Sequence, residues 1–331
     1  MLGKIRSHFI LEQIVKENIE EKIYLNIFQY NKNLQKRLKI SVKDYKNYYS
    51  KRIIIELMPK KELNEGKQFF IRFNQKNKQY FHIYFDNNNY EEERNYITNK
   101  DKINKIKIVI DSQIKSFNYL FRNCTCLEEI NFIRCERKNI NNMHSMFQEC
   151  YSLTKVDLSN LKTDNVKTMR TMFEDCTSLK ELNLSNFNTK KVFTMYGMFR
   201  NCSSLTNLII NNFDTSNVMH MGDMFYRCSS LKSLDLTNFN TEKVVYMNYM
   251  FYHCDSLINL DITNFNLKNV KGMDLMFTGC KEELQNLIKS QIHGFRNEAF
   301  LKSYLKSYLE KYYEFSLYKS NYSIIYKANK I

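Results

Sequence analysis

The chain has 331 residues, a formal net charge of +15, nine cysteines and a single proline. Its hydrophobic content of 43% excludes a wholly disordered protein. No uncharged apolar run is long enough for a transmembrane helix, and charged residues interrupt residues 1–21, so we expect neither a membrane span nor a secretory signal. These features predict a cytoplasmic protein with reduced cysteines.

The positive charge is concentrated towards the two ends of the sequence. Cations exceed acidic residues by 8 in residues 1–104, by 3 in residues 105–280 and by 4 in residues 281–331. A nucleic-acid groove requires clustered cations, so we expect no nucleic-acid binding through the central part. The basic flanks are compatible with contact to RNA or an anionic membrane, but we favour a solvated lysine-rich surface as their explanation.

The first part of the chain, residues 1–97, predicts a small α+β region. Apolar alternation predicts strands at residues 51–57, 68–73 and 79–85. Residues 1–40 are predicted to be helical, with a small core from Phe9, Ile10, Ile14, Ile23, Ile27, Leu34 and Leu38. The segment from Leu25 to Leu34 also resembles an F-box, although the leucine-proline opening of that motif is missing. That resemblance implies an adaptor that recruits a partner through its N-terminal helices.

The central part, residues 98–280, is built on one fixed interval. A cysteine recurs every 26 residues, and a Met-Phe pair keeps the same register from Met146-Phe147 to Met276-Phe277. A fixed period of this length predicts a solenoid of stacked coils. The alternating Ile106, Ile108 and Ile110 predict a shortened first coil. The periodic cysteines are Cys124, Cys150, Cys176, Cys202, Cys228, Cys254 and Cys280.

Within one repeat, apolar spacing predicts which side chains enter the core. Leu182 and Leu184 alternate with polar residues, which is typical of a short strand. Met195, Met198 and Phe199 at helical spacing predict a short helical turn whose apolar face is buried. The strand ends at an asparagine whose amide can bond the backbone of its own and the neighbouring coil. The equivalent asparagines are Asn160, Asn186, Asn212, Asn238 and Asn264.

The periodic cysteines occupy equivalent places, each between an apolar Met-Phe pair and a leucine. This context predicts a ladder of reduced, buried thiols. Disulfides between neighbouring coils are geometrically possible and remain an alternative. Cys124, Cys126 and Cys135 could form part of a metal site, but no second cysteine or histidine pair completes it. We expect no metal and no cofactor.

The pattern Cys-x-Ser-Leu-x-x-Leu-x-Leu-Ser-Asn-Phe-x-Thr-x-x-Val-x-x-Met-x-x-Met-Phe resembles the BspA-like leucine-rich repeat of mycoplasma and protozoan surface proteins. The resemblance covers roughly residues 98–280. It implies an α/β repeat fold, a right-handed leucine-rich-repeat solenoid, with adhesion or protein binding as its function. It also implies placement at a cell surface, which differs from the cytoplasmic location predicted above.

The last part, residues 281–331, predicts a helical cap and a tail. Leu284, Leu287 and Ile288 fall on one side of a helix over residues 281–292. A second segment, residues 299–313, has Leu301, Tyr304, Leu305, Tyr308 and Leu309 at helical spacing. We expect this segment to pack on the last coil or on a partner.

The sequence favours a non-catalytic, monomeric protein that binds another protein through polar strand residues. His144, His220 and His253 fall in different repeat registers, and no catalytic triad or glycine-rich phosphate loop is present. Ile209 stands in an otherwise polar column and could anchor a partner. The acidic bias of the column favours a basic or amide-rich partner. The predicted partner-binding residues are Asp157, Glu181, Asn183, Asn207, Ile209, Asn211, Asp235, Thr237, Asp261 and Thr263.

Overall fold

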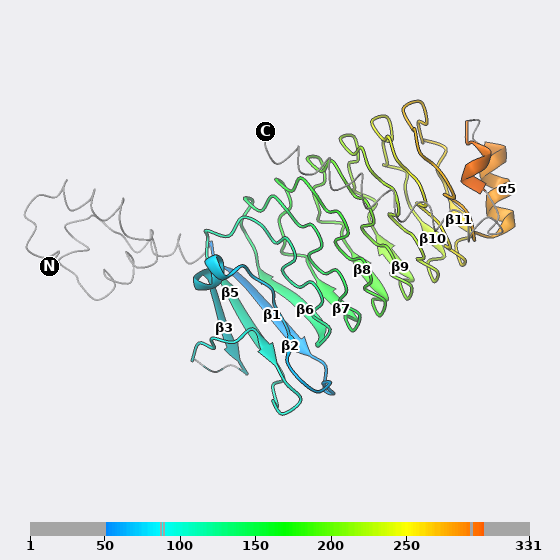
Figure 1. Cartoon of the computed structure of the whole chain (residues 1–331). Coiled ribbons are helices and arrows are strands. Elements are labelled where there is room, and N and C mark those ends of the chain that lie inside the picture. The colour runs from blue at the N-terminus through cyan, green and yellow to red at the C-terminus, as the bar shows by residue number, and fades with distance from the viewer. Residues whose placement is uncertain (1–50, 87, 89, 292–293, 301–331) are drawn as a thin grey trace, which may run out of the picture.

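The computed structural model describes residues 51–300 except 87, 89, 292 and 293. Figure 1 shows an elongated stack of coils with a small sheet at one end and helix α5 at the other. Within the described ranges, no helix is long and apolar enough to cross a lipid bilayer. The helices predicted for residues 1–40, the F-box-like segment and the helical spacing beyond residue 300 lie outside the described residues.

The sheet at the N-terminal end has five strands in the order β3-β5-β1-β6-β7. All pairs in it are antiparallel except β6 with β7. The strands are β1 (Ile53–Pro59), β3 (Phe81–Phe85), β5 (Ile106–Ile110), β6 (Leu127–Arg134) and β7 (Lys155–Asp157). A smaller pair, β2 (Gln68–Phe69) with β4 (Tyr96–Ile97), and the 3-10 helix η2 (Gln75–Tyr80) lie beside it. The predicted strands are therefore present, although the second is only two residues long.

The prediction that Ile106, Ile108 and Ile110 begin the first coil is wrong. These residues form β5, which pairs antiparallel with β1 and β3, whereas neighbouring coils pair in parallel. Alternating isoleucines fit either kind of pairing, because the side-chain period of two is the same in both. The ladder of parallel bridges between coils begins later, at the pair of Ser116 with Asn142.

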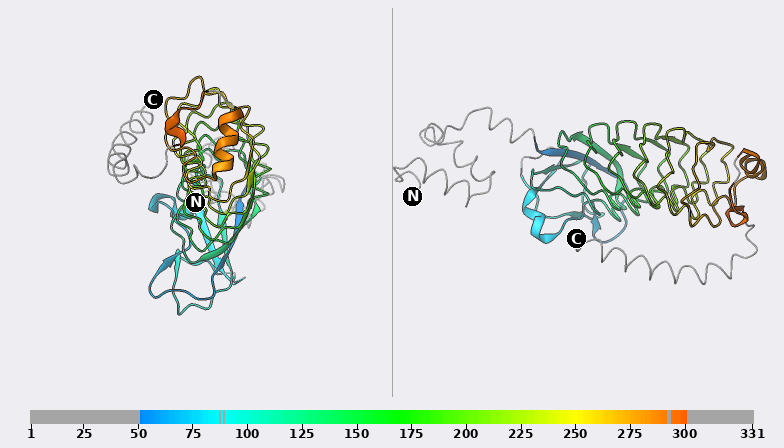
Figure 2. Two further views of the ribbon diagram at one scale, coloured as in Figure 1. Left: turned by 90° about the vertical axis from the view of Figure 1, so that its right-hand side faces the viewer. Right: turned by 90° about the horizontal axis from the view of Figure 1, so that it is seen from above.

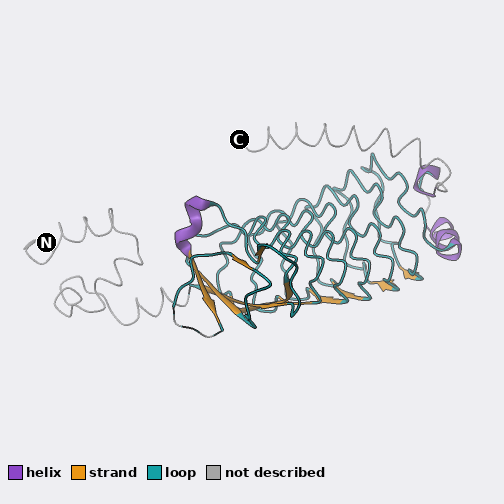
Figure 3. Ribbon diagram, turned by 60° about the horizontal axis from the view of Figure 1, so that its bottom comes forward, coloured by secondary structure: helices purple, strands orange, loops and turns teal. Residues whose placement is uncertain are grey.

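The coils stack in the register that the sequence predicts. The remaining strands are β8 (Glu181–Asn183), β9 (Asn207–Ile209), β10 (Ser233–Leu234) and β11 (Asn259–Leu260). Residues 26 positions apart face each other in parallel, as Glu181 does with Asn207. A second ladder of parallel bridges continues to Gly272 on the return part of each coil. The strands lie along one side of the stack, and loops and turns form the other sides (Figures 2 and 3).

The core is continuous from coil to coil. Leu182, Leu184, Phe187 and Val192 are all buried, as predicted, and both methionine columns are buried throughout. The phenylalanines of the Met-Phe pairs form one column of stacked rings, with centroids 5.1 Å apart at Phe147–Phe173 and 5.8 Å at Phe173–Phe199. Offset-stacked rings contribute beyond simple area burial, so this column ties each coil to the next.

The Met-x-x-Met-Phe segment is not the helical turn that its spacing predicts. It forms a series of tight turns in which Gly197 and Asn201 both have a φ of +58°. The N–H of Met198 bonds the carbonyl of Met195 in its own coil, while the N–H of Gly197 bonds Gly222 in the next coil. The register of Gly197 is occupied in neighbouring coils by Thr171 and Asp223, also at positive φ. The side chains of Met195 and Met198 point into the core from these turns, so the turns bury them as fully as a helix would.

Polar side chains form ladders between coils. The Asn186 amide donates to the carbonyls of Leu158, Ser159 and Leu161 in the preceding coil, at 2.9–3.1 Å. The predicted contact with the neighbouring coil is confirmed, whereas the hydrogen bonds found do not go to its own coil. A buried threonine column works in the opposite direction, since the hydroxyl of Thr189 donates to the carbonyl of Asp214 in the following coil.

The thiols form the predicted reduced ladder. All nine cysteines are free and buried. Each periodic thiol from Cys150 to Cys280 donates to the carbonyl of a phenylalanine in the preceding coil, as Cys202 does to Phe173 at 3.1 Å. Burial raises the pKa of the Cys202 thiol well above its ordinary value and that of Cys228 to about 12. The thiols therefore act as small buried hydrophobes with one weak hydrogen bond each.

Both ends of the stack are covered. Strand β1 pairs with the free edge of β6 at the N-terminal end. At the other end the N–H groups of Leu275 and Phe277 bond the carbonyls of Glu298 and Ala299, and Phe300 stacks on Phe277 at 5.3 Å. The segment η3 (Asn297–Phe300) thus replaces the next coil.

Helix α5 (Glu282–Gln291) lies beside this segment at the predicted place. Leu284 and Ile288 are buried, but Leu287, which the spacing places on the same side of the helix, is 43% exposed. The apolar face of the helix is accordingly narrower than the sequence suggested.

Alanine substitutions at the buried and exposed positions of one strand should differ sharply in how much they lower the free energy of unfolding. Leu208→Ala should lower the free energy of unfolding by about 2–5 kcal/mol because it opens a cavity in the core. Asn207→Ala on the exposed side should change it by well under about 1 kcal/mol. Urea unfolding of both variants measures the difference, and equal losses would contradict the register described above.

The thiol ladder should be unreactive in the folded protein. Because burial raises the pKa of Cys176, Cys202 and Cys228, almost no thiolate is present at mildly alkaline pH. Alkylation followed by intact mass measurement should show labelling only after denaturation. The exposed Ser233→Cys is the control and should take up one label without denaturant. Rapid native labelling of several cysteines, or a mass deficit from disulfides, would rule out the ladder.

Candidate interaction surface

The strand side of the stack presents three parallel rows of exposed residues, which we call the strand face. Every predicted partner-binding residue lies on it, and all are exposed. The middle row runs through Asp157, Asn183, Ile209, Asp235 and Asp261, since Asn183 pairs with Ile209 and the interval is constant. The outer rows contain Glu181 and Asn207 on one side, and Asn211, Thr237 and Thr263 on the other. The structure therefore brings the predicted residues together on one surface.

Most side chains of the middle row also accept a hydrogen bond within the turn that ends their own strand. The side-chain Oδ1 of Asp157 accepts from the N–H of Ser159 at 2.9 Å, and Asn183, Asp235 and Asp261 do the same two residues on. The hydroxyls of Thr237 and Thr263 donate to the same oxygens at 2.7 Å. Sequence reasoning missed this local role, although the spacing Asp-x-Ser/Thr is a known signal for such turns.

These turns fix the charge as well as the position of the carboxylates. The hydroxyl and N–H of Thr237 lower the pKa of Asp235, and those of Thr263 lower the pKa of Asp261. Both groups stay ionised to unusually low pH. The strand face therefore carries negative charges that are held in place before any partner arrives.

Ile209 interrupts the middle row. Its side chain is 36% exposed between Asn183 and Asp235, and its carbonyl accepts from Leu184 at 2.9 Å. One more isoleucine, Ile133 in strand β6, is 49% exposed in the register of Asn211. Apolar contact area is thus spread along the strand face.

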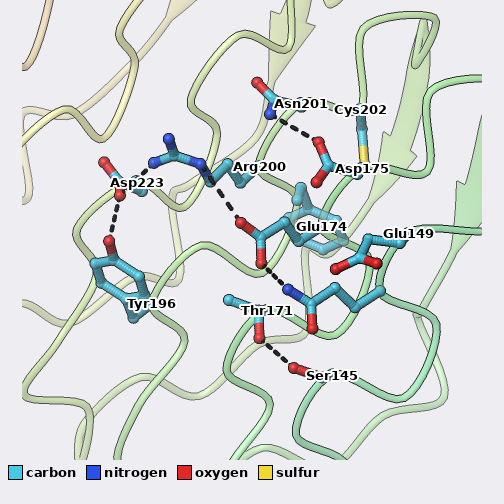
Figure 4. A network of polar contacts seen from close by, with 12 residues as sticks. Ser145, Glu149, Thr171, Glu174, Asp175, Tyr196, Arg200, Asn201, Cys202 and Asp223 are labelled. Carbon is cyan, nitrogen blue, oxygen red and sulfur yellow. Dashed lines mark hydrogen bonds and ion pairs between the residues drawn. The ribbon is translucent and has the colours of Figure 1, made fainter. Parts of the chain in front are cut away.

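A polar network links several coils on the turn side (Figure 4). The Asp223 carboxylate accepts from Tyr196 and lies 2.6 Å from Nη1 of Arg200. Arg200 also lies 3.5 Å from Glu174, which accepts from Gln148 at 2.6 Å. Burial raises the pKa of Asp223, while Arg200 opposes that shift.

The network joins side chains of successive coils by paired charges. Ser145 and Thr171 point towards each other, with their hydroxyl oxygens 2.7 Å apart, and they do not contact a histidine at an ordinary hydrogen-bond distance. The three described histidines of the repeats have separate partners. His144 contacts Tyr119 and the carbonyl of Arg170, His220 stacks on Tyr246, and His253 contacts Asp255. We interpret this network as a connection between coils.

A shallow groove of about 450 Å³ follows the same edge over four coils. It was not predicted from the sequence. Asn201 bonds Asp175 at 2.8 Å within it, and Arg227 lies on its exposed rim. Two columns of residues line it. One contains Asp175, Asn201, Arg227 and His253, and the other contains Thr177, Ser203, Ser229 and Asp255. Among the described residues, no group of three or more side chains is placed to hold a metal ion.

Sequence reasoning also missed an apolar column on the return part of the coils. Phe193 and Met219, one repeat apart, are 43% and 42% exposed. In the neighbouring register, Tyr246 is 43% exposed and stacks on His220 at 5.3 Å. The signal was present in the sequence, because Phe193 and Met219 replace the lysine found at the same register in Lys167 and Lys271.

Comparisons with known proteins place the repeats in a described family. The model of the family "Mycoplasma protein of unknown function, DUF285" matches residues 92–182, 115–209 and 178–290, which together span more than half of the chain. No curated protein is significantly similar to the chain. Among solved structures, a leucine-rich-repeat protein of T. pallidum is similar at 17% identity and a TM-score of 0.38, over 56% of this chain and 78% of that chain.

Two substitutions of Asp261 separate the effect of its hydrogen bonds in the turn from the effect of its charge. Asp261→Asn keeps an oxygen that accepts from Thr263 and should leave the melting temperature nearly unchanged. Asp261→Ala loses both bonds and should lower it slightly, because the side chain is exposed. As the folded pKa is lowered, the wild-type protein should lose this contribution as pH falls below the ordinary aspartate value. Thermal melts against pH test this, and identical acid profiles for wild type and Asp261→Asn would contradict it.

Proposed function

The chain belongs to the family described as Mycoplasma protein of unknown function, DUF285, and we propose that it is a non-catalytic module that binds a protein through its strand face. The observation that carries the proposal is the register-locked rows of exposed residues, from Asp157 to Thr263, on one side of a rigid stack. Such rows present repeated contacts to an elongated partner without any chemistry of their own.

Rigidity supports the proposal energetically. Binding costs free energy when interface side chains must be ordered. The carboxylates of Asp157, Asp235 and Asp261 are already ordered by their own turns, and each keeps a second oxygen that the turn does not require. A partner that meets this oxygen row therefore gains hydrogen bonds at a reduced entropic cost.

The chemistry of the face defines the partner. Four acidic side chains, Asp157, Glu181, Asp235 and Asp261, lie in its rows, and the cation Lys155 is close to Glu129, at 3.5 Å. Electrostatic complementarity favours an extended segment rich in lysine, arginine or amide side chains. Ile209 supplies an apolar contact in the middle of the face, where an anchor contributes most.

The finer assignments belong to the same proposal. A BspA-like leucine-rich repeat is supported by the leucine, asparagine and phenylalanine columns of each coil. Adhesion at a cell surface and binding in the cytoplasm use the same face, and we propose the cytoplasmic form. The adaptor interpretation depends on residues 1–50, which lie outside the described residues, and it stays a prediction.

Charge reversal on the strand face should abolish binding without unfolding the protein. Glu181→Lys with Ile209→Lys changes an exposed acid and the exposed isoleucine in neighbouring coils. Asp235 is left intact because its side chain holds a turn. The matched control is Glu242→Lys with Met219→Lys, which makes the same two kinds of change at exposed positions on the return part of the coils.

The probe is a random-peptide display library selected against the full chain. We expect enrichment of lysine, arginine, asparagine and glutamine, and a loss of affinity of about tenfold or more for the strand-face variant only. Melting temperatures of both variants should match that of the wild type. Peptides that bind the strand-face variant as well as they bind the wild type would overturn the proposal.

A further inference from the structure

A shallow, open cavity of about 460 Å³ lies where three chain segments meet at one edge of the N-terminal sheet, beside the turn that carries Asn165. The start of β1, the end of β5 and the end of β6 come together there, because β1 is antiparallel to both neighbours and Ile53 pairs with Ile110. The cavity is lined by Lys51, Ser112, Arg137, Lys138, Asn139 and Asn165. This lining contains three cations and no acidic residue.

Arg137 is the unusual member of this group. Its side chain is buried, at 7% exposure, and its Nη1 donates to the carbonyl of Asp111 at 3.1 Å. Its Nε and Nη2 are also buried and have no hydrogen-bond partner among the described residues. Guanidinium does not lose its proton in proteins, so a permanent charge stands beneath the cavity with three of its five N–H donors unsatisfied. Buried charges are normally paired, which makes this arrangement informative.

The two unsatisfied nitrogens form one edge of the guanidinium. The N–H bonds of Nε and Nη2 point in the same direction, and this parallel pair is the fork that binds two oxygens of a phosphate or carboxylate at once. The other end of the group is fixed by its bond to Asp111. Arg137 is therefore oriented before any ligand binds.

The nearby acids already have other partners among the described residues. The carboxylate of Asp111 is held by Nε of Arg52 at 2.8 Å and by Nε2 of His82 at 3.2 Å. Asp164 lies 3.5 Å from the ammonium group of Lys138, at the rim. Lys51 and Lys138 are both exposed, so they are able to close over a bound anion. The net positive charge of the lining favours a doubly charged anion over a singly charged one.

We propose that this cavity binds a phosphate group, with Arg137 as the bidentate donor and Lys51 and Lys138 as the cations that close over it. Ser112 and Asn139 supply further donors at the lining. The nitrogens of the fork are buried beneath the lining, so an anion reaches them only when exposed side chains of the lining rearrange. The site is separate from the strand face, and it does not depend on the function proposed above.

Isothermal titration of the full chain with inorganic phosphate tests the proposal, at constant ionic strength in a chloride buffer. We expect saturable binding at one site and a melting temperature that rises with phosphate concentration. Lys51→Gln with Lys138→Gln should weaken binding about tenfold or more, while Lys180→Gln, an exposed lysine on the strand side, should leave it unchanged.

Arg137→Lys keeps the charge and removes the fork, so it should weaken binding further. If that variant fails to fold, the two rim lysines still decide the outcome. Vesicles containing phosphatidic acid distinguish a lipid phosphate from a soluble one, since they should sediment the wild type but not the double lysine variant if the source is a lipid. Failure of phosphate to saturate at millimolar concentrations, or equal binding of acetate, would overturn the proposal.

Discussion

The structure depends on hydrogen bonds that pass from each coil to the next. In the turns from Gly197 to Cys202, N–H groups alternately bond a carbonyl of the following coil and a carbonyl of the same coil. This alternation requires left-handed residues such as Gly197 and Asn201 at fixed places. A coil that gained or lost one residue would shift both kinds of bond at once, so the repeat length of 26 is a physical constraint.

The same constraint explains the two different ends. On the strand side, N–H groups bond both neighbouring coils, as Thr206 does to Lys180 in the preceding coil and Leu184 does to Ile209 in the following coil. On the turn side they bond forward, as Phe173 does to Met198. The first coil therefore needs a partner for its strand edge, which β1 provides. The last coil needs carbonyls for its turn N–H groups, which Glu298 and Ala299 provide. At each end of the stack, a segment outside the repeats supplies the backbone hydrogen-bond partners that a further coil would otherwise provide.

The sequence was sufficient for the features that follow from periodicity. Columns such as Phe173–Phe199 or Cys176–Cys202 define the register, the core and the exposed face directly. It was insufficient where two structures share one pattern. The alternation in β5 fits antiparallel or parallel pairing, and Met195, Met198 and Phe199 enter a core from a helix or from turns. Positive φ was hidden because Thr171 and Asp223 occupy positions where glycine is the usual signal.

The exposed sites were harder to predict, because exposure alone does not assign a role. Asp235 and Asp261 were correctly placed on the strand face, but their turn bonds emerge only from the backbone geometry. Arg137 gave no signal in the sequence, since nothing there distinguishes a buried guanidinium from a solvated one. Arg137 lines a cavity only because the segments around Lys51 and Ser112, which are distant in sequence, meet beside it.

The last coil lacks one side chain that the other coils use to bond the coil that follows. Thr163, Thr189, Thr215 and Thr241 share one register, and each hydroxyl donates to a backbone carbonyl of the following coil. The next residue in that register is Leu267, which belongs to the last coil and packs against the core instead. A threonine there would have no following repeat to receive its bond. The change from hydroxyl to methyl groups occurs where the acceptor disappears, which indicates that the threonine column stabilises the contact between coils rather than the coil that contains it.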